Sequence, residues 1–179
     1  CSMCHKEGIH SKKENLLTNE DFAYIYEIAN KEYGINKVTL SRELSKTELE
    51  DILKYNLDID TELIVYGTLP IMSCNYCFLG KSNMCYPECK RLCSDDNSYY
   101  LKDRLGFKFR IVSDNIQSIT SIFNSKILSI SPKTFNVSSV RIDILDENVT
   151  TINKIIETVK SGKSFEGKEY TSGRLEEEK

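Results

Sequence analysis

Five cysteines lie close together in the middle of the chain. Their spacing is Cys74-x2-Cys77-x7-Cys85-x3-Cys89-x3-Cys93. Residues 1–10 contain no apolar signal-peptide region, and in such a context closely spaced thiols typically bind a metal or carry out redox chemistry. The sequence therefore predicts a metal or redox centre in this segment.

A proline indicates how some of these thiols are brought together. Pro87 suits the first turn of a helix, which would place Cys89 and Cys93 one turn apart on one face, with Cys85 just before it. Neighbouring cations favour the thiolate, and four thiolates suit either structural zinc or an iron–sulfur cluster. The spacing alone leaves the metal open, and buried thiols or disulfides are the alternative.

The machinery of the common hydrolases is missing from the body of the chain. His5 and His10 are the only histidines, which disfavours Ser-His-Asp and Cys-His catalysis. No H-E-x-x-H motif and no glycine-rich phosphate loop occurs. Cys1-x-x-Cys4-His5 matches a haem-attachment pattern without any supporting context, so chance or extra metal ligation is the favoured interpretation.

The elements that must position the thiols alternate between helix and strand. Helical periodicity covers 19–33 and 149–159, and a capping box at Ser45 and Glu48 begins a helix between them. Strand-like runs occupy 37–40, 62–66, 127–130 and 140–145, and residues 99–112 read as a hairpin turning at Gly106. A cysteine loop fills 67–98. This order predicts an α/β architecture.

Composition describes an ordinary globular chain. Its 179 residues are 28% charged and 40% hydrophobic, with a net charge of -3 and no apolar run long enough to span a bilayer, so we expect a cytoplasmic protein without a membrane partner. We expect an N-terminal segment (1–18), one α/β domain (19–162) with the loop at 67–98, and a charged, extended or disordered tail (163–179). Because the chain begins with Cys1, we expect a fragment of something longer.

Several short runs together resemble one known family. They are ELIVYGTLPIM at 62–72, Tyr76-Cys77, CYPEC at 85–89, YLKDRLG at 100–106, NSK at 124–126, FEGKEYT at 165–171, and a segment at 38–44 ending in Leu-Ser-x-Glu-Leu. From about residue 30 onward the chain is similar to the collagenase-like peptidase family, numbered thirty-two among peptidases of unassigned catalytic type. The order and spacing of the runs carry this resemblance.

The resemblance implies a fold. It implies a TIM-like barrel of which this chain holds the C-terminal half, with the cysteine-rich loop as an insertion. Strand ends at Ser41, Tyr66 and Arg141 would face the site. Because a complete barrel needs about 250 residues, the missing N-terminal half is a predicted partner.

The resemblance also implies a cofactor. Better understood members of the family hold a 4Fe-4S cluster on four cysteines. Cys77, Cys85 and Cys89 match family positions, whereas the cysteine that many members carry after the hairpin is replaced near Ile116 and Gln117. Cys93 is the predicted fourth ligand, Cys74 is the alternative, and Cys1 or Cys4 come next. Zinc is the alternative metal.

The resemblance finally implies an activity. Better understood members take part in oxygen-independent hydroxylation of tRNA or rRNA pyrimidines, or of a quinone precursor, with prephenate implicated as the oxygen source. Peptidase activity is the older label, and a zinc-stabilised binding module is a further alternative. We favour hydroxylation of an RNA pyrimidine or a small aromatic substrate.

Charged residues supply candidates for substrate binding. Residues 81–110 hold seven cations against four carboxylates, which favours tRNA or rRNA as a partner and leaves a small carboxylate co-substrate possible. Arg104, Lys102, Arg141 and Glu43 are the candidate catalytic residues. An exposed loop or a solvated ion pair is the alternative reading of each. Tyr99 and Tyr100 either stack on a base or pack across the hairpin.

Overall fold

The computed structural model describes residues 19–54, 59–81, 88–94, 97–114, 116 and 119–175. The chain divides into two compact units. Unit 1 holds the chain through Leu63, Phe135–Ser139 and the residues from Arg174 onward, and unit 2 holds Ile64–Thr134 and Val140–Gly173. The predictions for Cys1, Cys4, His5, His10 and Cys85 lie outside the described residues, and the predicted domain ranges stay a prediction.

Unit 1 contains the two predicted N-terminal helices and a parallel strand pair. Helix α1 (Asn19–Tyr33) ends at Gly34, whose φ of +65° is left-handed, as helix C-caps commonly are. Strand β1 (Lys37–Thr39) runs parallel to the first half of β2 (Asp60–Gly67), with Lys37 opposite Asp60. These elements confirm the predicted helix, strand, helix, strand order.

Helix α2 (Lys46–Lys54) begins at the predicted capping box. The Ser45 hydroxyl accepts the backbone N–H of Glu48 at 3.4 Å, and the Glu48 carboxylate accepts the backbone N–H of Ser45 at 2.7 Å. Hydrogen bonds from Ser45 lower the pKa of the Glu48 carboxyl. Leu49 and Ile52 then bury the inner face of the helix. The box therefore fixes where the helix starts.

Ser45→Ala is expected to lower the free energy of unfolding by about 1 kcal/mol, because it removes the side-chain cap. Because the folded-state pKa of Glu48 is depressed, its reciprocal bond contributes above the ordinary carboxyl pKa and is lost as the pH falls through the folded-state pKa. Urea unfolding near neutral pH and at about pH 3 checks both effects. Ser98→Ala, at an exposed position, is the control and should leave the free energy of unfolding unchanged at both pH values.

Unit 2 is built around the second half of β2. Strand β7 (Ile127–Ser129) pairs antiparallel with β2 and parallel with β9 (Tyr170–Thr171), and β8 (Ser139–Ile142) also pairs with β2. Helix α4 (Val149–Lys160) starts at Asn148, whose side chain accepts the N–H of Thr151, and buries Ile155 and Val159. The predicted strand at 127–130 and helix at 149–159 are confirmed, and the predicted strand at 140–145 is confirmed as far as Ile142.

The segment after α4 is more ordered than the sequence indicated. Tyr170–Thr171 form β9, and Gly173–Leu175 form the 3-10 helix η3. The Phe165 N–H donates to the Ser129 hydroxyl at 2.7 Å. The predicted extended or disordered tail therefore contains regular structure at Tyr170–Thr171 and Gly173–Leu175, which the charged composition did not indicate.

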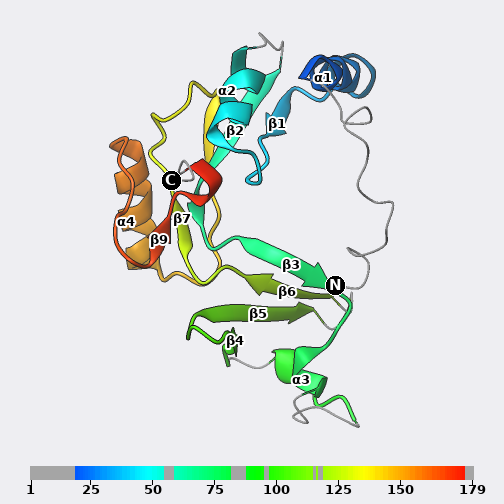
Figure 1. The fold of residues 1–179 in the computed structure, drawn as a ribbon, viewed down its shortest axis with the longest axis vertical. Coiled ribbons are helices and arrows are strands. Elements are labelled where there is room, and N and C mark those ends of the chain that lie inside the picture. The colour runs from blue at the N-terminus through cyan, green and yellow to red at the C-terminus, as the bar shows by residue number, and fades with distance from the viewer. Residues whose placement is uncertain are drawn as a thin grey trace. The chain divides into compact units, whose positions relative to one another are not determined.

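A four-stranded antiparallel sheet forms the other part of unit 2. Its order is β3 (Pro70–Cys74), β6 (Ile119–Phe123), β5 (Lys108–Asp114) and β4 (Tyr99–Lys102) (Figure 1). The β4–β5 hairpin confirms the prediction. Strands β3 and β6 were not predicted, and β3 shortens the expected loop because residues 70–74 belong to the sheet.

The two sheets confirm an α/β fold at the coarse level. The β1–β2 and β7–β9 pairs are parallel, whereas the β2–β7 pair and every pair of the second sheet are antiparallel. Neighbouring strands of a TIM barrel are all parallel. The β2–β7 pair and the whole second sheet therefore depart from TIM-barrel pairing, and only the β1–β2 and β7–β9 pairs share its strand direction. Within the part of the chain that the structure describes, no helix has the length and apolar character needed to cross a membrane.

Candidate functional site

Strand β3 carries the cysteine segment away from the antiparallel sheet. Cys74 is the last residue of the strand, lies opposite Thr120 of β6 and is half-buried. Cys77 follows in an exposed position just before the short helix α3 (Phe78–Lys81). The register with β6 therefore holds Cys74 in place, and the chain immediately after it presents the Cys77 thiol to solvent.

The Cys77 sulfur has a backbone hydrogen bond. The N–H of Gly80 donates to its Sγ at 3.3 Å. On the same segment, the rings of Tyr76 and Phe78 meet edge to face at 5.1 Å, and Leu79 is buried. Cys77 is thus exposed, and its sulfur is held in place by a backbone hydrogen bond.

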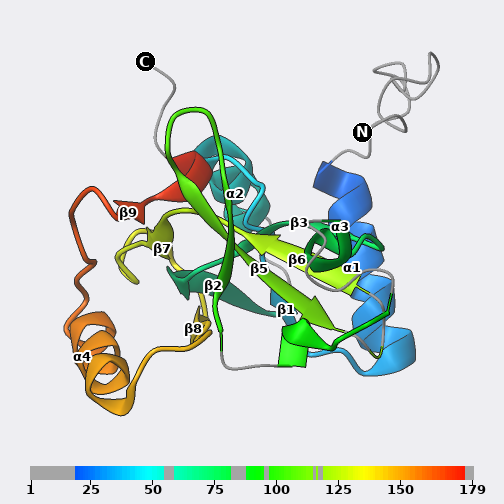
Figure 2. The same cartoon turned by 90° about the horizontal axis from the view of Figure 1, so that it is seen from below.

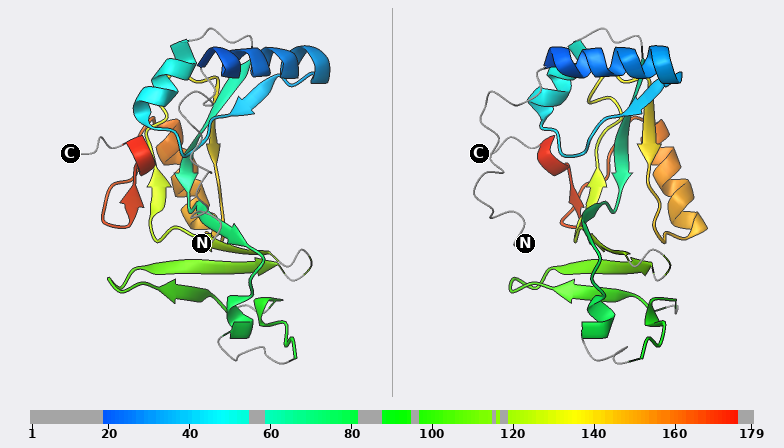
Figure 3. Two further views of the ribbon diagram at one scale, coloured as in Figure 1. Left: turned by 45° about the vertical axis from the view of Figure 1, so that its right-hand side comes forward. Right: turned by 90° about the vertical axis from the view of Figure 1, so that its right-hand side faces the viewer.

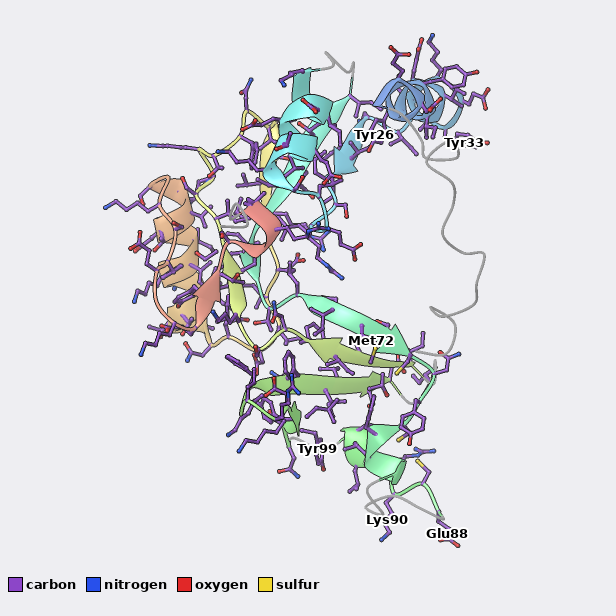
Figure 4. All side chains as sticks on the ribbon, viewed as in Figure 1. Tyr26, Tyr33, Met72, Glu88, Lys90 and Tyr99 are labelled. Atoms are coloured by element: carbon purple, nitrogen blue, oxygen red, sulfur yellow. The ribbon has the colours of Figure 1, made fainter. Side chains whose placement is uncertain are left out.

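The predicted helix carrying Cys89 and Cys93 is not present. Arg91 has a φ of +52°, which an α-helix cannot contain, and only Leu92–Ser94 form a turn of 3-10 helix, η2. Cys93 is half-buried in η2, which lies beside β5, while Cys89 is exposed. Figure 4 shows Glu88 and Lys90 at the far end of this segment from the sheet. The helical argument for a shared sulfur face was therefore wrong.

The donor chemistry fits a thiolate-bound metal or cluster. Cys74, Cys77 and Cys93 carry free thiols, and Cys89 is exposed. Among the residues with described positions, no three candidate ligands gather into a metal-binding group. Because Cys85 lies outside those residues, the predicted set of Cys77, Cys85, Cys89 and Cys93, with Cys74 as the alternative, stays a prediction.

One charged residue of the hairpin has a structural role in its turn. The Asp103 carboxylate accepts the backbone N–H groups of Leu105 and Phe107, each at 2.9 Å. Asp103 therefore shapes the turn. Its neighbours Lys102 and Arg104, both candidate catalytic residues, are exposed. They are available to a ligand.

The remaining two candidates have structural partners. Arg141 forms a two-point ion pair with Asp143, at 2.5 Å from Nε to Oδ1 and 3.2 Å from Nη2 to Oδ2. The exposed Glu43 donates its N–H to the Ser41 hydroxyl at 3.3 Å, and its backbone carbonyl accepts from Arg174 at 2.9 Å. Neither arrangement identifies a catalytic role, so both assignments stay predictions.

An aromatic cluster that the sequence did not indicate packs at the end of β2. Phe165 meets the ring of Tyr66 edge to face at 5.7 Å and stacks on Tyr170 at 5.4 Å, with the Lys154 ammonium 5.8 Å from its centre. Burial, followed by the Glu147 carboxylate and Tyr170, raises the pKa of Tyr66 to about 12. Tyr66 lies in the run at 62–72, and Phe165 and Tyr170 lie in the run at 165–171. Only the structure brings their rings together.

A second unpredicted cluster surrounds Glu62 in unit 1. The Glu62 carboxylate accepts the Thr39 hydroxyl at 3.0 Å and the Ser139 hydroxyl at 3.4 Å, and Lys37 lies 3.9 Å away. These residues come from three strands, so pairing of the strands creates the group. In the sequence, the polar residues Lys37 and Thr39 alternate along one strand, and Glu62 begins the next strand-like run. This pattern was the signal that could have indicated the group.

Comparison with known proteins identifies one family. The model of the family described as peptidase family U32 matches residues 9–152. A search of curated proteins found no match, and neither did a search of solved structures. The matched range includes all five cysteines of the central segment and the whole antiparallel sheet. The chain belongs to peptidase family U32.

Proposed function

We propose that the cysteine segment binds a 4Fe-4S cluster through Cys77, Cys85, Cys89 and Cys93, with Cys74 as the alternative fourth ligand. The observation that carries this proposal is the anchoring of closely spaced thiols by the antiparallel sheet: Cys74 ends β3, and η2 with Cys93 lies beside β5. Thiolates are the usual ligands of such clusters. A cluster bound there would supply one-electron chemistry.

The residues around the thiols support binding in three ways. The Gly80 N–H donates to the Cys77 sulfur and holds it in position. The β3–β6 register limits the motion of Cys74, whereas the exposed Cys77 and Cys89 leave room for a bound group. Rigid support on one side with open thiols on the other is the arrangement that a cluster-binding segment needs.

We propose that the whole protein acts in oxygen-independent hydroxylation of an RNA pyrimidine or a small aromatic substrate. Support comes from membership of family U32 and from the thiol chemistry. The α2 helix and the parallel β1–β2 pair would belong to a TIM-like half-barrel that pairs with an N-terminal half as its partner, in the cytoplasm. Peptidase activity is the alternative, and it requires a nucleophile that the described residues do not identify.

Metal analysis tests the cluster directly. The chain should be purified without oxygen, and iron, acid-labile sulfide and zinc measured per chain. We expect about four iron and four sulfide with little zinc, as a 4Fe-4S cluster requires. Stoichiometric zinc without iron would instead establish a zinc-stabilised binding module, and absence of both metals would favour the peptidase alternative.

A further inference from the structure

The β4–β5 hairpin presents cations and an aromatic ring on one face. Lys102 lies directly opposite Lys108, and the adjacent pair along the ladder on that face is Tyr100 with Arg110. Opposite residues of an antiparallel ladder project to the same side, and side chains two apart along a strand share a face. The two arms run side by side to the turn in Figure 2.

The charges on this face are poorly compensated. Lys102 and Lys108 are both exposed, and in the described part of the chain neither has an ion-pair partner. Like charges directly opposite each other destabilise a strand pair. The Asp103 carboxylate, which follows Lys102 in the chain, accepts two N–H groups of the turn. Arg104 adds a third exposed cation at the turn. The hairpin is therefore an anion-attracting end of an otherwise acidic chain.

The neighbouring pair adds an ordered guanidinium and an open ring. Arg110 is held by an ion pair with Asp146 of the segment before α4. Tyr100, opposite it, is 51% exposed. A tyrosine of a hairpin that served only to fill the core would be buried. Here the ring is open to a planar ligand and lies next to the two lysines along the strands.

We propose that this face of the hairpin binds single-stranded RNA, with Lys102, Lys108 and Arg104 on phosphates and Tyr100 stacked on a base. Cations that follow the backbone beside an aromatic platform are the common means of holding single strands. An acidic peptide would use the cations and leave the ring without a role. The choice of RNA rests on the proposed function, whereas binding itself requires no cluster.

The test measures RNA binding by the 179-residue chain. The probe is a fluorescein-labelled oligouridylate, titrated by anisotropy at several salt concentrations. Lys102→Gln with Lys108→Gln should weaken binding and lower the salt slope by about 1.4, because each phosphate contact on a single strand contributes about 0.7. Tyr100→Leu should weaken binding about tenfold without changing the slope, because it removes the stacking ring and no charge.

Matched controls isolate the hairpin from general charge. Lys163→Gln with Lys168→Gln removes two exposed cations elsewhere in unit 2 and should leave the affinity and the slope near the parent values. Circular dichroism checks that every variant is folded. The proposal is overturned if the hairpin variants bind like the parent, if the parent does not bind, or if polyglutamate displaces the probe as well as unlabelled oligouridylate does.

The same titration separates this proposal from the cluster. Binding is measured on iron-loaded protein and on protein purified in air without iron. RNA binding by a chain that never holds iron would refute the cluster proposal and support the RNA-binding proposal for the hairpin. Iron retained in a chain that does not bind RNA would refute the RNA-binding proposal and leave the cluster proposal standing.

Discussion

Cys77→Ser and Cys77→Ala should both abolish iron binding, reducing iron and sulfide to background. Serine keeps an oxygen that can accept the Gly80 N–H, whereas alanine removes the acceptor. An alcohol is a poor replacement for thiolate at a cluster, because soft sulfur ligands hold these iron centres. The pair of variants therefore separates ligation from the local hydrogen bond. Anaerobic iron and sulfide analysis with visible absorption spectra measures the result.

The outcome depends on which variant fails. Loss of iron in both variants supports ligation by Cys77. Iron retained at the parent level in Cys77→Ser but lost in Cys77→Ala would assign Cys77 a structural role as hydrogen-bond acceptor. Cys74→Ser and Cys93→Ser serve as matched substitutions at the two half-buried thiols. Whichever of them keeps the full iron content is not the fourth ligand.

Gly67→Ala should destabilise unit 2 by about 2–4 kcal/mol. Gly67 ends β2 with a φ of +149°, and a Cβ at this position would lie 2.6 Å from the carbonyl oxygen of Asp143. Asp143 cannot move freely, since its N–H donates to the carbonyl of Tyr66 at 2.8 Å and its carboxylate pairs with Arg141. Backbone strain of about 1–3 kcal/mol adds to a lost hydrogen bond of about 1 kcal/mol.

Gly34→Ala is the control for backbone strain without a clash. Gly34 also has a left-handed φ, but a Cβ there would meet no atom within 4 Å. We expect a loss of about 1–2 kcal/mol at this position. Urea unfolding followed by circular dichroism compares the variants. Equal losses for the two alanine variants would show that the approach of Asp143 to Gly67 is unimportant.

Elements with local signals were predictable. The capping box at Ser45 and Glu48 began α2 where expected, and Asn148 and Gly162 bound α4. The hairpin turned at Gly106 because a residue with φ of +92° is needed there, and glycine adopts this conformation without strain. In each case the hydrogen bonds join residues only a few positions apart, so neighbouring residue types contain the information.

Strands with distant partners were missed. Strand β6 carries Thr120 and Ser121 in its centre, which hides the apolar alternation that identifies strands. Strand β3 lies within the cysteine segment, and its Ser73 hydroxyl meets that of Ser121 at 3.1 Å. Figure 1 shows β3 and β6 side by side, and Figure 3 gives two further views of the same sheet. Their pairing depends on contacts between segments far apart in sequence, which composition and periodicity do not encode.

The sequence by itself determined the thiol inventory, the family, the coarse α/β class and the charge of the hairpin. Only the tertiary structure decided that Cys74 ends a strand, that Arg91 breaks the helix expected between Cys89 and Cys93, and that Phe165 lies between Tyr66 and Tyr170. The physical reason is the range of the interactions. Side-chain chemistry and helix caps act between near neighbours, whereas strand register and ring packing are settled only when distant segments meet.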